Sequence, residues 1–272
     1  MIPRARAALA VLLLGAGQGL AEPRLERLDS FSWSDPPLGG LSSLELSADG
    51  GQFITVSDRG LRIEGLIRRE GTRIAGLEVV ATHPIRRRDG QIAEGVEVDS
   101  EGLACREPAI GAACDISFEE IARVAEFETP DSAARNRPRP GWFNQLQANS
   151  GLEALAVDGA GRLYAIPERS GDLERPFPVY RLDGAHWSQP FALERRPPYL
   201  PVGADFDAEG RLYVLERQFA TIAFSSRVRR LTLDGDRIVR DETLLQTPLG
   251  LHDNLEGIAV WTDAEGATRV TM

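Results

Sequence analysis

The chain contains 272 residues, which is enough for one large domain or two ordinary ones. Hydrophobic residues make up 42% of it and the charged residues are scattered, a composition that excludes wholesale disorder. The formal net charge is −10, and all 31 basic residues are arginine. An acidic surface of this kind disfavours nucleic acids and anionic membranes as partners.

Residues 1–21 have the pattern of a secretory signal peptide. Arg4 and Arg6 precede an apolar run, and small residues follow up to Ala21, where we expect cleavage. The apolar run is too short to span a bilayer, and no cysteine follows the cleavage site. We therefore expect residues 22–272 to form a domain that is exported to the periplasm or secreted, without insertion into a membrane.

Several stretches of the chain resemble one another, and each contains a short apolar strand, an Asp-Gly turn and a second strand. They are "GLSSLELSADGGQFITVSDRG" (40–60), "GLEALAVDGAGRLYAIPERSG" (151–171), "GADFDAEGRLYVLERQF" (203–219) and "NLEGIAVWTDAEGATRVTM" (254–272). Residues 99–121 fit as a copy with an enlarged turn. Further strand pairs lie between the copies, which gives four strands per unit, and helical periodicity is nearly absent. The repeat predicts an all-β fold, a β-propeller with five visible units and a sixth expected.

The two cysteines, Cys105 and Cys114, close a short loop within the enlarged turn. In an oxidising compartment we expect them to form a disulfide. Nothing near them in the sequence indicates a metal site or a catalytic thiol, so the disulfide is interpreted as a structural staple.

In a propeller, the first strand of each blade begins, and the second strand ends, at the same mouth of the central channel. Two sets of polar residues should therefore meet there. The inner strands supply Glu101, Asn149, Glu153, Asp205, Asn254 and Glu256. The second strands end in the pairs Asp58–Arg59, Glu168–Arg169 and Glu216–Arg217.

Clustered carboxylates repel one another, and a bound Ca²⁺, which takes six to eight oxygen ligands, would compensate for this repulsion. The arginines can compensate instead, or can bind an anionic group of a substrate. A third interpretation is structural, because carboxylates at blade starts can accept hydrogen bonds from backbone amides of the adjacent blade.

The repeated stretches resemble the phytase-like family, described as "esterase-like activity of phytase". The resemblance rests on "GLSSLELSADGGQFITVSDRG", "DSEGLA", "NSGLEALAV", "RLYVLERQF" and "DNLEGIAV", which together span most of residues 22–272. It implies an exported six-bladed propeller related in shape to calcium-dependent propeller phytases, without fixing a substrate. The sequence departs from those phytases because it has no lysine and no recognisable acidic cluster of their kind. A Gly-x-Ser-x-Gly elbow is also absent, which leaves a serine esterase unsupported.

The last repeat is incomplete as written. By the pattern of the other copies, a carboxylate should follow Gly266 by six or seven residues, but the sequence stops at Met272. We expect truncation of the last blade, or completion of it by an N-terminal strand at residues 24–33.

Three functions are compatible with these features. The first is a metal-dependent hydrolase of small anionic phosphate or carboxylic esters, acting as a monomer. Its predicted catalytic residues are Glu101, Glu153 and Glu256. Its predicted metal ligands are Glu101, Asn149, Glu153, Asp205, Asn254 and Glu256. Its predicted substrate-binding residues are Arg59, Arg169 and Arg217.

The second function is a calcium-dependent lactonase of the gluconolactonase type, for which Asn149, Asn254 and Glu256 suit the metal shell. The third is a non-catalytic periplasmic binding or scaffold propeller, in which the carboxylates are structural.

Overall fold

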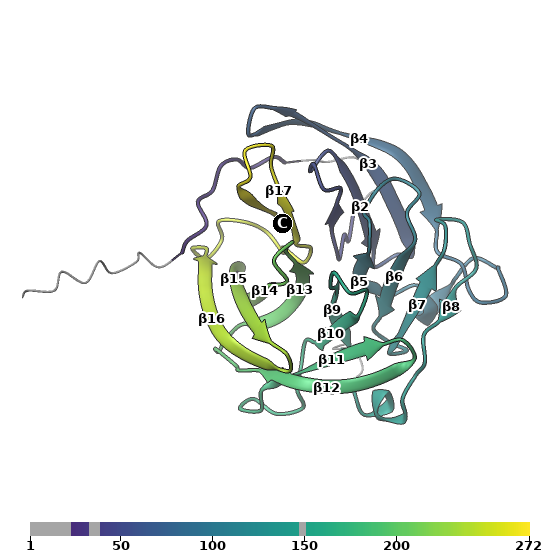
Figure 1. The fold of residues 1–272 in the computed structure, drawn as a ribbon. Helices are drawn as coiled ribbons and strands as arrows, with labels where there is room; N and C mark the ends of the chain where they lie inside the picture. The colour runs from purple at the N-terminus through teal and green to yellow at the C-terminus, as the bar shows by residue number, and fades with distance from the viewer. Residues whose placement is uncertain (1–22, 33–38, 147–150) are drawn as a thin grey trace, which may run out of the picture.

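The computed structural model describes residues 23–32, 39–146 and 151–272, and these form an all-β propeller (Figure 1). Blade 1 contains β1 (Glu45–Leu46), β2 (Gln52–Ser57), β3 (Leu61–Glu70) and β4 (Arg73–Pro84). Blade 2 contains β5 (Ser100–Cys105), β6 (Cys114–Phe118), β7 (Arg123–Phe127) and β8 (Arg135–Asn136). Blade 3 contains β9 (Leu152–Val157), β10 (Leu163–Pro167), β11 (Phe177–Asp183) and β12 (His186–Leu193). Blade 4 contains β13 (Leu200–Phe206), β14 (Leu212–Ala220), β15 (Ala223–Asp234) and β16 (Arg237–Gln246).

A hairpin of β17 (Ala259–Thr262) and β18 (Thr268–Thr271) follows blade 4. All neighbouring strands within the blades are antiparallel. Two short 3₁₀ helices, η1 (Gly95–Glu97) and η2 (Gly141–Gln145), lie in the connections, and no helix in the described part of the chain has the length and apolarity to cross a membrane. The predicted signal peptide lies outside the described residues.

The predicted hairpin turns are present, and their chemistry explains why they recur. Asp158, Asp207 and Asp263 each accept hydrogen bonds from the backbone N–H groups two and four residues later. In all three turns the glycine three residues after the aspartate has a positive φ, which a side chain rarely tolerates. The Asp-x-x-Gly spacing therefore fixes the register of each inner strand against the second strand.

The glycines that begin several repeats let neighbouring inner strands touch. A Cβ atom on Gly203 would lie 2.5 Å from the carbonyl oxygen of Glu256. A Cβ atom on Gly257 would lie 2.6 Å from the backbone of Ser43, and one on Gly102 would lie 2.6 Å from Leu155 Cβ. These positions have no room for a side chain because the innermost strands pack directly around the axis.

The expectation of six blades is not confirmed. The described residues form four four-stranded blades and one hairpin, and β17 packs against both β13 and β1, which closes the ring. Apolar clusters join the hairpin to blade 4 through Val202 and Ile258, and to blade 1 through Ala259 and Phe53. The ring therefore has five units, and the last unit has two strands among the residues described.

The N-terminal strap, residues 23–32, contains no strand, so the described part of the expected N-terminal strand does not complete the last unit. It runs outside the β17–β18 hairpin from blade 4 to blade 1 (Figure 1). The Leu25 N–H donates to the Leu244 carbonyl at 2.9 Å, and the Ile74 N–H donates to Asp29 Oδ2 at 2.8 Å. The strap thus ties together the two blades that flank the hairpin.

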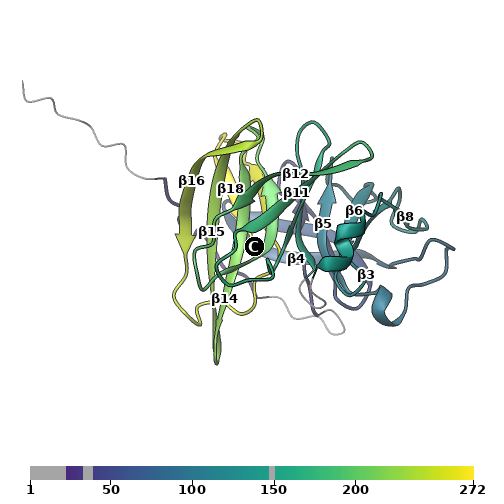
Figure 2. The same ribbon diagram turned by 90° about the horizontal axis from the view of Figure 1, so that it is seen from below.

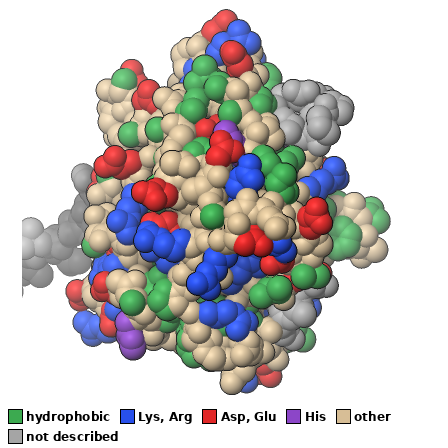
Figure 3. All heavy atoms as spheres, turned by 90° about the vertical axis from the view of Figure 1, so that its right-hand side faces the viewer, with side chains coloured by type: hydrophobic (Ala, Val, Ile, Leu, Met, Phe, Trp, Pro, Cys, Tyr) green, Lys and Arg blue, Asp and Glu red, His purple; other side chains and the backbone are tan. Residues whose placement is uncertain are grey.

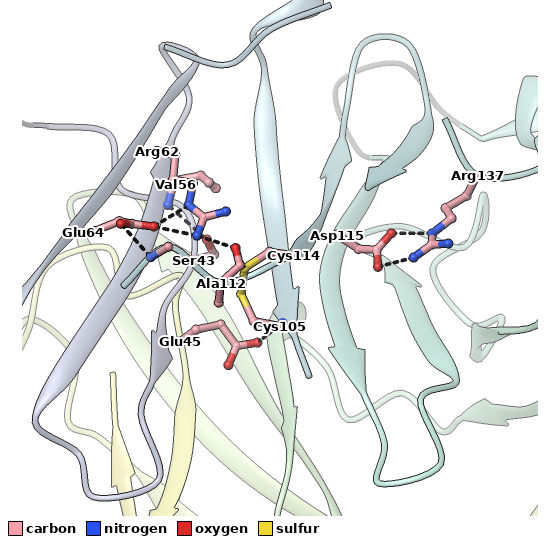
Figure 4. Close-up of a disulfide and its surroundings, with 11 residues drawn as sticks. Ser43, Glu45, Val56, Arg62, Glu64, Cys105, Ala112, Cys114, Asp115 and Arg137 are labelled. Carbon is pink, nitrogen blue, oxygen red and sulfur yellow. Dashed lines mark hydrogen bonds and ion pairs between the residues drawn. A yellow bond between two sulfur atoms is a disulfide. The ribbon is translucent and has the colours of Figure 1, made fainter. Parts of the chain in front are cut away.

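The predicted disulfide is confirmed, because Cys105 on β5 and Cys114 on β6 are directly opposed and bonded (Figure 4). The loop that they close leans on blade 1. There the Arg62 guanidinium donates to the Ala112 carbonyl at 2.8 Å, and Arg62 also bonds to Glu64 while both side chains are buried. The disulfide-closed loop therefore packs at the interface between blades 1 and 2 and is not a free hairpin tip.

Two further views show the side and one outer face of the molecule. The blades stand roughly side by side in Figure 2, and the β14–β15 hairpin projects beyond them on one face. On the face shown in Figure 3, arginine side chains are interspersed with aspartate and glutamate side chains. Ion pairs also cross between blades, as where Arg181 of β11 meets Asp236 at 2.6 Å.

Candidate metal centre

Three carboxylates take equivalent positions where the second strand of a blade reaches the mouth. Asp58, Glu119 and Glu168 follow β2, β6 and β10, and each donates its backbone N–H to a carbonyl in the segment that leads into the inner strand of its blade, at 2.9, 3.0 and 3.3 Å. Asp58 and Glu168 were predicted to lie here. Glu119 was not, although the signal was present, because the Glu119–Glu120 pair follows its strand as Asp58–Arg59 follows β2.

Blade 4 departs from the predicted pattern by one residue. Arg217 pairs with Leu200 at the start of β13, so Arg217 occupies the position that a carboxylate holds in the other blades. Successive residues of a strand point to opposite faces, so Glu216 points into the blade. There its fully buried carboxylate bonds Arg227 at 2.5 Å and Arg229 at 2.9 Å. Glu216 is therefore part of the blade interior and not of the mouth.

The inner strands add further carboxylates to the same place. Ligand oxygens of Asp99, Glu101 and Glu119 all lie within 4.8 Å of one another. Glu153 and Glu119 share a side-chain hydrogen bond, as do Glu119 and Asp99. The whole set is called the mouth cluster, and its members are Asp58, Asp99, Glu101, Glu119, Glu153, Glu168 and Glu256.

The mouth cluster carries strong electrostatic repulsion. Burial, followed by the charges of Asp99 and Glu119, raises the pKa of Glu101 to about 9. Burial and the charge of Glu101 raise the pKa of Glu153 well above its usual range. Burial also raises the pKa of Glu256, although Arg217 opposes this shift. The clustered carboxyl groups must therefore either bind protons or be neutralised by a cation.

Arg217 contacts two carboxylates of the cluster and is the least exposed of the arginines paired with it. It donates to Asn254 Oδ1 at 2.7 Å and to Glu168 Oε1 at 3.0 Å, and it contacts Glu256 as well. Asn254 donates to Glu256 at 2.6 Å. Arg217 therefore joins the blade 3 side of the mouth to the segment that precedes β17, and its guanidinium is already occupied by these partners.

The donor set of the mouth fits a hard cation. Carboxylate oxygens of Asp99 and Glu101 at the start of β5 and of Glu119 after β6 lie close together, and Glu153 of β9 is bonded to Glu119. Ca²⁺ prefers such oxygen ligands, whereas zinc prefers nitrogen and sulfur. The cluster can therefore hold a metal ion through Asp99, Glu101 and Glu119.

A family model described as "Esterase-like activity of phytase" (Phytase-like) matches residues 36–272. The chain belongs to this family. No curated protein matches the phytase-like chain.

Two solved structures resemble the phytase-like chain at low identity. One is the extracellular domain of a protein described as a one-component system from B. thetaiotaomicron. Its TM-score is 0.43 at 9% identity, covering 88% of this chain and 27% of that chain. The other is the PQQ-bound aldose sugar dehydrogenase from Streptomyces coelicolor. Its TM-score is 0.44 at 10% identity, covering 86% of this chain and 93% of that chain.

Not every predicted site residue of the phytase-like protein lies in the cluster. Asp205 sits near the end of β13 and accepts the Val260 N–H at 2.6 Å, which bonds blade 4 to the last hairpin. In the same way, Glu45 of β1 bonds blade 1 to blade 2 by accepting the Cys105 N–H at 3.0 Å. Burial raises the pKa of Asp205 to about 7, and burial and Asp205 raise the pKa of Glu45 well above its usual range. This geometry matches the structural interpretation of blade-start carboxylates.

The remaining predicted residues lie at the rim or outside the described chain. The Arg59 and Arg169 side chains are 68% and 56% exposed, and within the described residues they form ion pairs with their neighbouring acids, Asp58 and Glu168, at 3.8 and 3.5 Å. Asn149 lies outside the described residues.

The central channel is nearly filled below the mouth. A cavity of about 10 Å³ lies on the axis, with residues of all five inner segments in its wall, including Glu153 and Glu256. This volume is roughly that needed by one water molecule. A ligand larger than a water molecule therefore cannot pass along this part of the axis.

Proposed function

We propose that this phytase-like propeller is an exported, calcium-dependent hydrolase of phosphate or carboxylic esters, acting as a monomer. The observation that carries the proposal is the mouth cluster, in which Asp99, Glu101 and Glu119 converge within 4.8 Å. The disulfide supports export, because such bonds persist in oxidising compartments.

Asp99, Glu101 and Glu119 would hold the ion, with Glu153 and Glu256 beside them. Bound calcium would supply Lewis-acid polarisation of the ester. The chain's own residues do the rest. Glu153, which shares a side-chain hydrogen bond with Glu119 beside the ion, can pass a proton to the leaving oxygen. Arg59 and Arg169 lie at the rim with their guanidinium groups open to an anionic substrate, and Arg217 orients Glu256.

Calorimetry with calcium on the chelator-treated protein tests the metal site without requiring turnover. We expect tight binding that weakens about 10- to 100-fold in Glu119→Gln and in Glu153→Gln. The matched control is Asp205→Asn, which changes a carboxylate on an inner strand outside the cluster and should leave calcium affinity unchanged. Equal affinity in all four proteins, or no binding at all, would contradict the proposal.

A substrate panel then separates the functions. Cleavage of phosphomonoesters or carboxylic esters that is lost on chelation would support the hydrolase. Opening of lactones without ester cleavage would select the lactonase, for which Asn254 beside Glu256 is the favouring contact. Calcium binding without turnover of any of these compounds would select a binding or scaffold propeller.

A further inference from the structure

A second hollow lies beside the mouth, over the outer strands of blade 3. It has a volume of about 700 Å³ and is bounded by η2, by β11 and β12, and by the loop that follows β10. Small-molecule sites typically occupy a few hundred to about 1,000 Å³, so this hollow is large enough for an organic ligand. We call it the aromatic pocket, after Trp142, Tyr180 and Trp187 in its wall.

The aromatic wall is held in place from behind. The Trp142 and Tyr180 rings stack with centroids 4.1 Å apart, and the buried ring of Phe143 packs against Trp142 and Trp187 at 4.6 and 5.3 Å. Trp187 Nε1 donates to the Pro138 carbonyl at 2.7 Å. Flat rings that are fixed in this way favour stacking with another flat ring, because little side-chain entropy is lost on binding.

The pocket wall combines aromatic rings with polar side chains such as Gln145 and Gln189, and it is charged at the end that adjoins the mouth. Arg169 lines the pocket and directly follows Glu168 of the mouth cluster. Its guanidinium is mostly exposed and has one long contact, at 3.5 Å to Glu168. Arg175, by contrast, is bonded to the Ser170 carbonyl at 3.2 Å. Among the described residues, Arg169 is therefore the pocket cation with the longer contact, and its exposed guanidinium can receive an anion.

We propose that the aromatic pocket binds the aryl ring of an anionic ester, with the anionic group at Arg169 and the ester directed toward the mouth cluster. The fate of the ester rests on the proposed function, but binding of the ring does not. The proposal makes the substrate class of the mouth an aryl ester rather than a small aliphatic one.

Intrinsic fluorescence can test ring binding without turnover, because two of the four tryptophans, Trp142 and Trp187, line the pocket. The chelator-treated protein is titrated with phenyl phosphate and with methyl phosphate. We expect phenyl phosphate to bind at least about tenfold more tightly, from burial of one ring face. Equal affinity for the two compounds would overturn the proposal.

Substitutions place the effect in the pocket. Trp142→Ala and Tyr180→Leu should each reduce the affinity for phenyl phosphate toward that for methyl phosphate, and circular dichroism checks that both variants are folded. The matched control is Phe219→Ala, which removes a 61% exposed aromatic side chain from β14 on another blade and should keep the preference. A preference that survives both pocket variants, or that is lost in Phe219→Ala, would contradict the assignment. So would glucose 1-phosphate binding as tightly as phenyl phosphate.

The outcome is separable from that of the proposed function. A protein that fails to bind calcium but prefers phenyl phosphate would support the aromatic pocket as a binding site and contradict the proposed calcium-dependent hydrolase. A protein that binds calcium through Glu119 but shows no ring preference would do the reverse.

Discussion

The propeller contains two groups of buried carboxylates that the sequence repeat makes look alike. The braced carboxylates, Glu45, Asp205 and Glu216, face hydrogen-bond donors from a neighbouring inner strand or from arginines. The carboxylates of the mouth cluster face mainly other carboxylates, so they have fewer hydrogen-bond donors to offset their negative charge. The comparison teaches that the donors around an acid, rather than its place in the repeat, separate a structural carboxylate from a candidate ligand.

The largest expected effect comes from removing a braced carboxylate. Glu216→Ala leaves the buried Arg227 and Arg229 without their shared partner, and we expect a loss of about 3–5 kcal/mol in the free energy of unfolding. Chemical denaturation measures it. Calcium affinity in the protein that remains folded should not change, and a large drop in that affinity with little loss of stability would break the comparison.

Removing a mouth carboxylate should increase, rather than decrease, the free energy of unfolding of the metal-free protein. The folded-state pKa of Glu101, about 9, lies above its ordinary value of 4.5, so stability is lost as the pH rises toward 9. Glu101→Gln removes this loss, and we expect a gain of about 1–2 kcal/mol at pH 8 with chelator present. With saturating calcium the variant should instead be the less stable protein. Thermal unfolding with and without chelator shows both changes.

A smaller effect, on the pH dependence of stability, distinguishes Asp205 from the mouth cluster. Its folded-state pKa of about 7 exceeds the ordinary 3.8, so its contribution to stability is full below pH 3.8 and is lost as the pH rises through about 7. Asp205→Asn keeps an oxygen for the Val260 N–H but cannot ionise. We expect a flatter dependence of the melting temperature on pH between 4 and 7, identical with and without calcium. A calcium-dependent change would move Asp205 into the metal site.

The smallest expected effect concerns the rim. Arg169→Gln should raise KM for an aryl phosphate about three- to tenfold with little change in kcat, because the guanidinium is exposed and screened by solvent. Arg59→Gln is the matched control, since Arg59 is also exposed but does not line the aromatic pocket, and it should have less effect. Equal changes for the two would indicate general attraction of anions.

Local features were predictable because they depend on local chemistry. The Asp-Gly turns, the propeller architecture and the Cys105–Cys114 pair all follow from short-range patterns and are present in the structure. The choice between Glu216 and Arg217 was not predictable in this way, because β14 continues past the mouth and a one-residue offset reverses the face.

The membership of the candidate site was predicted only in part. Glu101, Glu153 and Glu256 were placed at the mouth from the repeat, and the structure brings them there. Asp99 and Glu119 were missed because their importance depends on the spacing between strands that only the closed ring sets. The number of blades depends in the same way on how tightly the glycine-bearing inner strands pack.

The N-terminal strap has a consequence for how the molecule comes apart. An open row of repeats frays from its two ends, and each end unit can melt without the others. Here Leu25 and Asp29 bond to blades 4 and 1, while β17 touches both β13 and β1, so within the described residues every unit contacts a neighbour on each side. We therefore expect unfolding to begin where the strap and the β17–β18 hairpin detach from blade 4 or blade 1. Only after that step does the ring become an open row of repeats with two exposed ends.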